Sequence, residues 1–151
     1  MHTILFPGSF NPFTVGHQSL VARVLPLFDR VVIAVGVNSS KECDDEASQR
    51  VETIRALYAS EPKVSVIAYS GLTVDACVAE GARWMLRGVR SAVDFEYERN
   101  LADINRRISG IETLLLFTLP EYAAVSSSMV RELRSYGRDV SEFLPQPATE
   151  K

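Results

Sequence analysis

Short apolar runs alternate along this chain with longer segments of helical periodicity, and this alternation constrains the fold more than any other feature. The runs that predict buried strands lie at residues 3–6, 31–37, 64–69, 84–86 and 112–118. The segments that predict helices lie at residues 16–25, 47–58, 73–79, 92–107 and 127–136. We therefore expect an α/β fold, a Rossmann-like, doubly wound, five-stranded parallel sheet with helices on both faces.

The size and composition of the chain indicate one ordinary globular domain. We expect a single domain over residues 1–151, of which 146–151 form a frayed tail. A net charge of −3 disfavours a nucleic-acid partner, and no apolar run is long enough to span a bilayer, so we expect no membrane partner either. The N-terminus lacks the pattern of a signal peptide, which predicts a cytoplasmic protein.

The cysteines and histidines indicate no metal site built from the protein's own side chains. Cys43 and Cys77 have no metal-binding spacing, and we expect reduced thiols, although a single disulfide stays open. The only histidines are His2 and His17, which excludes a histidine-rich zinc site.

The first candidate site residues follow the first predicted strand, where sheets of this kind bind ligands. Residues 8–17 contain neither a dinucleotide-binding glycine pattern nor a P-loop. Gly8 and Gly16 allow a ligand to approach the backbone closely. His17 falls in the first turn of a helix, where it can donate a hydrogen bond to a phosphate. The alternative is a helix-capping loop with a surface histidine.

Three more segments at strand ends carry cationic or hydroxyl groups. After the fourth strand, Arg87 and Arg90 on a short turn can grip two phosphates, or they can form exposed ion pairs with the acidic residues of 94–98. After the fifth strand, residues 126–128 are serines that offer hydroxyl and N–H donors, or simply an N-cap. Lys41 follows the second strand, where the alternative is a solvated side chain.

Taken together, these segments resemble the nucleotidyltransferase superfamily with the Thr/His-x-Gly-His motif and, more narrowly, the bacterial phosphopantetheine adenylyltransferases. The resemblance covers nearly the whole chain and rests on Phe6-Pro7-Gly8-Ser9-Phe10, Thr14-Val15-Gly16-His17, Arg87-Gly88-Val89-Arg90, Asp94-Phe95-Glu96-Tyr97-Glu98, Asn105-Arg106, Pro120-Glu121-Tyr122 and Val125-Ser126-Ser127-Ser128-Met129-Val130. It implies transfer of the adenylyl group of ATP to 4′-phosphopantetheine, which gives 3′-dephospho-coenzyme A and pyrophosphate in coenzyme A synthesis. It also implies Mg²⁺ carried with ATP, coenzyme A as a feedback ligand, and a homohexamer made of two trimers.

The resemblance assigns roles to individual residues. The residues expected to act in catalysis are His17, Ser9, Lys41 and Arg90. The residues expected to bind ATP are Ser9, Phe10, His17, Gly88, Val89, Arg90, Glu98, Tyr122, Ala123, Ala124, Val125, Ser126, Ser127 and Ser128. The residues expected to bind phosphopantetheine are Ser9, Lys41, Thr73, Arg87 and Asn105. Because the acceptor phosphate is already ionised near neutral pH, we expect direct in-line attack, with no general base and no covalent intermediate.

Several residues depart from the family's pattern. Ser9 replaces a frequent threonine, Asn11 replaces a usual aspartate, and Thr73 replaces a frequent methionine. An acidic run at 44–46 replaces the usual residues near Lys41.

The sequence is also compatible with two other functions. One is a related transferase that uses nicotinamide mononucleotide or glycerol phosphate. Such relatives usually carry an Ile-Ser-Ser-Thr-x-x-Arg motif, of which this chain has Arg131 but not the threonine. The other is a nucleotide-binding regulator without turnover, which is disfavoured because His17 and both arginines are intact.

Overall fold

Five parallel strands form one sheet in the order β3-β2-β1-β4-β5, which confirms the predicted fold class. The computed structural model describes residues 1–38 and 44–147. The strands are β1 Thr3–Gly8, β2 Arg30–Gly36, β3 Val64–Tyr69, β4 Trp84–Val89 and β5 Glu112–Phe117. The helices are α1 Val15–Val24, α2 Asp44–Leu57, α3 Thr73–Ala79, α4 Ala92–Ser109 and α5 Ser127–Ser135. Three short 3₁₀ turns are η1 Leu25–Leu27, η2 Pro120–Tyr122 and η3 Ser141–Phe143.

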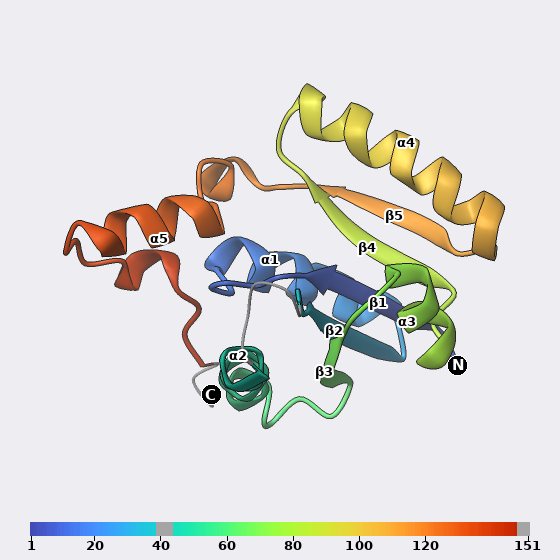
Figure 1. Ribbon diagram of the computed structural model, residues 1–151, viewed down its shortest axis with the longest axis horizontal. Coiled ribbons are helices and arrows are strands. Elements are labelled where there is room, and N and C mark those ends of the chain that lie inside the picture. The colour runs from blue at the N-terminus through green and yellow to red at the C-terminus, as the bar shows by residue number, and fades with distance from the viewer. Residues whose placement is uncertain (39–43, 148–151) are drawn as a thin grey trace.

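Helices cover both faces of the sheet (Figure 1). On one face, Leu20 and Val24 of α1 and Ile54 of α2 pack against apolar side chains of the strands. On the other face, Val74 and Cys77 of α3 pack against the alternate residues of the same strands. The strands are therefore buried on both sides, which explains their continuous apolar sequences.

Helix boundaries follow local signals that the sequence displays. Pro26 lies in η1, directly after α1, as its missing N–H and fixed φ predict. Gly110 ends α4 with φ +75°, and Gly137 follows α5 with φ +76°, a conformation that glycine adopts at little cost. The predicted bounds of β3 and α3 agree with those observed.

The fourth strand is longer than the sequence predicted, and this corrects the position of the two arginines. Arg87 and Gly88 lie inside β4, which ends at Val89, and only Arg90 follows the strand. The strand continues because β5 pairs with it residue by residue as far as Phe117. Arg87 and Arg90 therefore do not share one turn.

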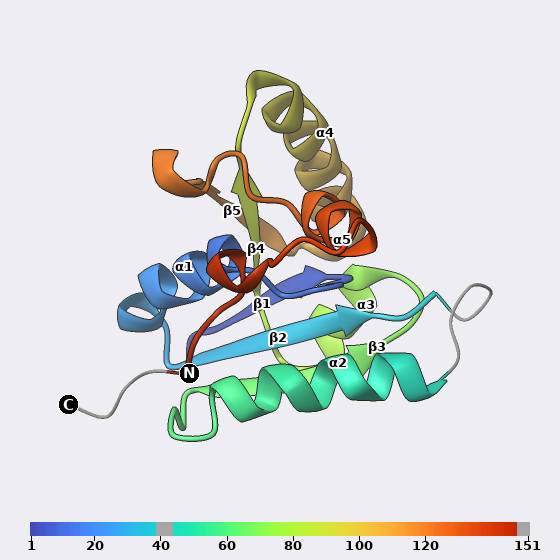
Figure 2. The same cartoon turned by 90° about the vertical axis from the view of Figure 1, so that its left-hand side faces the viewer.

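The segment after α5 runs back past α1 toward α2 (Figures 1 and 2). The side-chain amide of Gln18 on α1 donates to the carbonyl of Gln146 at 3.0 Å, so the predicted tail is held at its first residue, while 148–151 lie outside the described residues. Cys77 is a free, buried thiol, as expected, and Cys43 lies outside the described residues. Among the helices of residues 1–38 and 44–147, none combines the length and the apolar character needed to cross a bilayer.

Candidate active site

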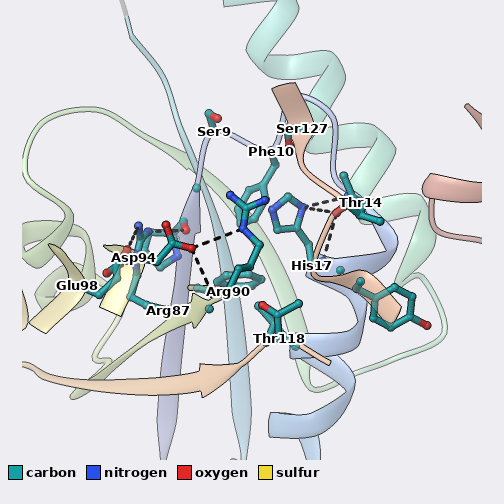
Figure 3. A pocket seen from close by; sticks show the side chains of 18 of the residues that line it. Ser9, Phe10, Thr14, His17, Arg87, Arg90, Asp94, Glu98, Thr118 and Ser127 are labelled. Atoms are coloured by element: carbon teal, nitrogen blue, oxygen red, sulfur yellow. Dashed lines mark hydrogen bonds and ion pairs between the residues drawn. The ribbon is translucent and has the colours of Figure 1, made fainter. Parts of the chain in front are cut away.

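A cavity of about 430 Å³ opens at the carboxyl ends of β1 and β4, where the strand order of the sheet reverses. Its wall brings together the loop after β1, the start of α1, the end of β4, the start of α4 and the segment before α5 (Figure 3). The predicted site residues that line it are Ser9, Phe10, His17, Arg87, Gly88, Arg90, Glu98, Tyr122, Val125 and Ser127.

His17 is fixed by the start of its own helix. Thr14 is the N-cap of α1, and its hydroxyl accepts a hydrogen bond from the His17 N–H. In return, the backbone N–H of Thr14 donates to Nδ1 of His17 at 3.0 Å. Since Nδ1 acts as the acceptor, the neutral imidazole carries its proton on Nε2. His17 therefore offers one N–H donor to a ligand.

Aromatic rings hold the His17 imidazole from three sides. Its ring centroid lies 5.0 Å from Phe10, 5.3 Å from Phe13 and 6.0 Å from Phe6. This burial lowers the pKa of His17 to about 4, and the positive charge of Arg90 contributes in the same direction. His17 is consequently neutral at pH 7.

We expect a protein NMR titration to show His17 uncharged down to about pH 5, well below the ordinary histidine value. The folded state then binds fewer protons than the unfolded chain between these pKa values, so its stability decreases as pH falls through this window. The pKa of His17 falls from 6.5 to about 4, which corresponds to about 3 kcal/mol in full and to about 2 kcal/mol between pH 7 and pH 5. Chemical denaturation at both pH values measures this loss.

His17→Gln is the comparison for this titration, because glutamine has no group that titrates in the window. The decrease in unfolding free energy between pH 7 and pH 5 should become smaller in the variant by about 2 kcal/mol. An equal decrease in both proteins would contradict the lowered pKa of His17.

Arg90 and Asp94 face the same cavity near the start of α4. Oδ2 of Asp94 accepts a hydrogen bond from the Arg90 N–H at 3.2 Å and lies 3.7 Å from Nε of the same residue. Both side chains are partly exposed, so this ion pair is weak. The guanidinium can therefore exchange this carboxylate for a phosphate.

Arg87 lies between the cavity of about 430 Å³ and a second cavity of about 250 Å³ at the ends of β1, β2 and β3. Glu98 of α4 holds it with bonds of 2.7 Å from Nη2 and 2.9 Å from Nε, and the Glu98 side chain is only 7% exposed. Burial alone lowers the pKa of Arg87, but the hydrogen bonds and charge of Glu98 raise it overall. The guanidinium is thus a permanent cation at the junction of two cavities, and Ser9 also lines both.

The hydroxyls of the three serines all form hydrogen bonds within the protein, but only that of Ser127 acts as the donor, so only its expected role as a free donor is corrected. Ser126 is the N-cap of α5 and accepts the N–H of Met129. Ser127 donates its hydroxyl to the carbonyl of Pro12 at 2.7 Å, and the Ser128 hydroxyl accepts from Arg131. The first turn of α5 also retains for an anion the backbone N–H groups of Ser127 and Ser128, which have no partner in the described part of the chain.

Some predicted residues lie outside the walls of both cavities as the structure describes them, namely Val89, Ala123, Ala124, Ser126, Ser128, Thr73 and Asn105. The Thr73 hydroxyl lies 2.9 Å from that of Tyr69, which lines the second cavity. Asn105 lies seven positions beyond Glu98 on α4, about two helical turns away. Lys41 falls outside the described residues.

Several residues that line the cavity were not predicted as site residues, among them Thr14, Asp94, Tyr97 and Thr118. Thr14 had a readable signal, because threonine three positions before a polar side chain at a helix start is a capping pattern. Asp94 also had a signal, as an acidic residue four positions after Arg90. Thr118 had none, since its approach to the cavity depends on how β5 packs.

The described residues hold no group of three or more His, Cys, Asp or Glu side chains placed to bind a metal ion. The cavity wall instead offers N–H and guanidinium donors, which suit phosphate oxygens.

Comparisons with known proteins agree with this geometry. Residues 5–133 match the cytidylyltransferase-like family. The chain is 54% identical to phosphopantetheine adenylyltransferase of Porphyromonas gingivalis, over 94% of this chain and 93% of that one. It is 49% identical to the enzyme of the same name from Phocaeicola vulgatus and 48% identical to that from Bacteroides fragilis, in each case over 97% of both chains.

A solved structure shares the fold at low sequence identity. The crystal structure of a proposed nicotinate-nucleotide adenylyltransferase from Vibrio parahaemolyticus superposes with a TM-score of 0.66 at 18% identity, over 97% of this chain and 95% of that one. A parallel sheet of this order, a half-buried histidine at the start of α1 and close relatives along almost the full length thus lead to one conclusion. The chain is a nucleotidyltransferase of the cytidylyltransferase-like family and belongs, within it, to the phosphopantetheine adenylyltransferases.

Proposed function

We propose that this chain transfers the adenylyl group of ATP to 4′-phosphopantetheine, with 3′-dephospho-coenzyme A and pyrophosphate as products. The observation that carries the proposal is the junction of two cavities at Ser9 and Arg87. The larger one is lined by His17, Arg90 and the start of α5, which suits a triphosphate. The smaller one leads away from the same junction along the ends of β2 and β3, which suits an acceptor that presents its phosphate there.

The chemistry requires two anions to be held against each other. The Nε2–H of His17 would donate to an oxygen of the α-phosphate, where charge develops during attack. Arg87 and the Ser9 hydroxyl would orient the acceptor phosphate, and we propose the same role for Lys41. Arg90 and the N–H groups of Ser127 and Ser128 would steady the departing pyrophosphate. Alignment and electrostatics then suffice, without a covalent intermediate.

Mg²⁺ fits this site as an ion carried by ATP. The donors in the wall are mostly N–H and guanidinium groups, so the ion would take its ligands from phosphate oxygens and water. When bound, it would neutralise part of the triphosphate charge. We also propose that the reaction takes place in the cytoplasm, where ATP is available.

We further propose a homohexamer of two trimers, with coenzyme A as a feedback ligand. An apolar stripe on α4 supports assembly, because Val93, Ile104 and Ile108 are 78%, 52% and 60% exposed on one side of the helix. Sedimentation equilibrium checks the assembly, and a monomer at assay concentration would contradict it. Coenzyme A resembles the product and would compete for both cavities.

The test of the proposed reaction is a pyrophosphate-release assay with ATP, Mg²⁺ and a panel of acceptors. We expect turnover with 4′-phosphopantetheine, loss of turnover when Mg²⁺ is chelated, and inhibition by coenzyme A. Turnover with nicotinamide mononucleotide or glycerol phosphate, and none with 4′-phosphopantetheine, would overturn the proposed acceptor. ATP binding by calorimetry without release for any acceptor would favour a regulator.

A further inference from the structure

The loop that follows β1 is held in place by α5 through its main-chain carbonyls. Nη1 of Arg131 donates to the carbonyl of Asn11 at 2.5 Å. One turn earlier on α5, the Ser127 hydroxyl donates to the carbonyl of Pro12. The position of this loop is therefore set by a helix more than one hundred residues away in the sequence.

Phe10 lies in the middle of that loop and needs external support. Its φ is +48°, in the left-handed region that bulky side chains adopt only when the surroundings enforce it. On its N-terminal side, Nε of Arg50 on α2 donates to the carbonyl of Ser9 at 3.0 Å. On its C-terminal side, Arg131 holds the carbonyl of Asn11. The carbonyls of both residues adjacent to Phe10 are thus held by arginines.

The Phe10 side chain links the position of this loop to the orientation of His17. Phe10 is 2% exposed, and its ring lies edge-on to the imidazole at a centroid distance of 5.0 Å. The ring also folds back over Gly8, where a β-carbon would lie 2.9 Å from it. Phe10 therefore has little room to move unless the loop moves with it, and the imidazole would follow.

Arg131 itself is placed to act on the loop rather than on a nucleotide. Its side chain lines neither cavity of the candidate site among the described residues. Its two terminal nitrogens are occupied, one by the Asn11 carbonyl and one by the Ser128 hydroxyl at 3.3 Å. The planar guanidinium suits two acceptors in fixed directions, which a lysine ammonium at the end of a flexible stem does not reproduce.

We propose that Arg131 is a positioning residue, which fixes the orientation of His17 through the Asn11 carbonyl and the Phe10 ring and does not bind ATP itself. The kinetic part of its test rests on the proposed function, whereas the spectroscopic part needs no substrate.

The spectroscopic test compares the imidazole NMR signals of the parent protein with those of Arg131→Ala. The chain has only two histidines, so the signals are readily assigned by comparison with His17→Gln. Ring currents from Phe10 depend steeply on distance and angle, so the His17 signals should shift in Arg131→Ala. His2 stacks on Trp84 at the other end of β1 and should keep its signals, as an internal control for the fold.

The kinetic test measures kcat and KM for the same variants. Arg131→Ala should lower kcat about 10- to 100-fold, the scale of a small misplacement of a reacting group, with KM for ATP changed by less than about threefold. Arg131→Lys should give a smaller loss, because one donor can still reach the loop. Arg138→Ala removes an exposed arginine just beyond α5 and is the matched control for charge.

In Arg131→Ala, both the NMR signals of His17 and the value of kcat must change. A fall in kcat without a shift of the His17 signals, or a shift without a fall in kcat, overturns the inference. A rise of about tenfold or more in KM for ATP at constant kcat also overturns it, because Arg131 would then be an ATP ligand. If Arg131→Ala does not fold, the His17 signals and kcat of Arg131→Lys are compared with those of the parent protein instead. An inactive parent protein would count against the proposed function, and the His17 shift would still decide whether Arg131 positions the imidazole.

Discussion

Replacement of His17 by alanine is expected to lower kcat by about 10²- to 10³-fold, the usual effect of removing one donor that stabilises a transition state. The donor is the Nε2–H, since Nδ1 already accepts the backbone N–H of Thr14. Because the imidazole is neutral, the loss should be one of hydrogen bonding and not of proton transfer. Steady-state kinetics at pH 7 measure it.

His17→Gln and His2→Ala are the matching variants for this prediction. Glutamine keeps an N–H donor and should recover part of kcat, whereas His2→Ala removes an imidazole distant from the cavity and should leave kcat within about twofold. A His17→Ala enzyme within about threefold of the parent in kcat would remove His17 from the proposed mechanism.

Replacement of Arg87 by alanine is expected to impair both acceptor binding and stability. KM for 4′-phosphopantetheine should rise about tenfold or more, and by more than KM for ATP, because Arg87 would hold the acceptor phosphate. In addition, the variant leaves the carboxylate of Glu98 buried without its partner, since that side chain is only 7% exposed. The free energy of unfolding should therefore fall by about 3 kcal/mol, as measured by chemical denaturation.

A double variant separates these two effects of Arg87. Arg87→Ala with Glu98→Gln removes the unpaired charge and should recover much of the lost stability, but KM for 4′-phosphopantetheine should stay high. Arg106→Ala removes an exposed arginine from α4 and controls for net charge. A larger rise in KM for ATP than for the acceptor would contradict the proposed role of Arg87.

The fold could be predicted from the sequence because its signals are local. Continuous apolar runs show that strands such as β2 are buried on both faces, and the bounds of β3 and α3 needed no further information. The ends of elements were less certain where pairing with a neighbour decides them. β4 extends to Val89 because β5 offers it partners, and no residue within β4 displays this.

The candidate site could be located from the sequence, but the uses of its side chains could not. His17, Arg90 and the start of α5 do line one cavity, because the carboxyl ends of parallel strands meet at one edge of the sheet. The sequence did not show that the Ser127 hydroxyl is bound to Pro12, or that Glu98 holds Arg87.

The sequence by itself determined which segments become strands and helices, and which chemical groups follow each strand, since apolar periodicity, capping residues and glycines act within a few positions. Only the tertiary structure decided which of those groups remain available to a ligand. Arg131 reaches Asn11 across 120 positions, and the Arg87–Glu98 pair forms only when α4 packs on β4. Such contacts depend on the relative placement of whole elements, which no local pattern encodes.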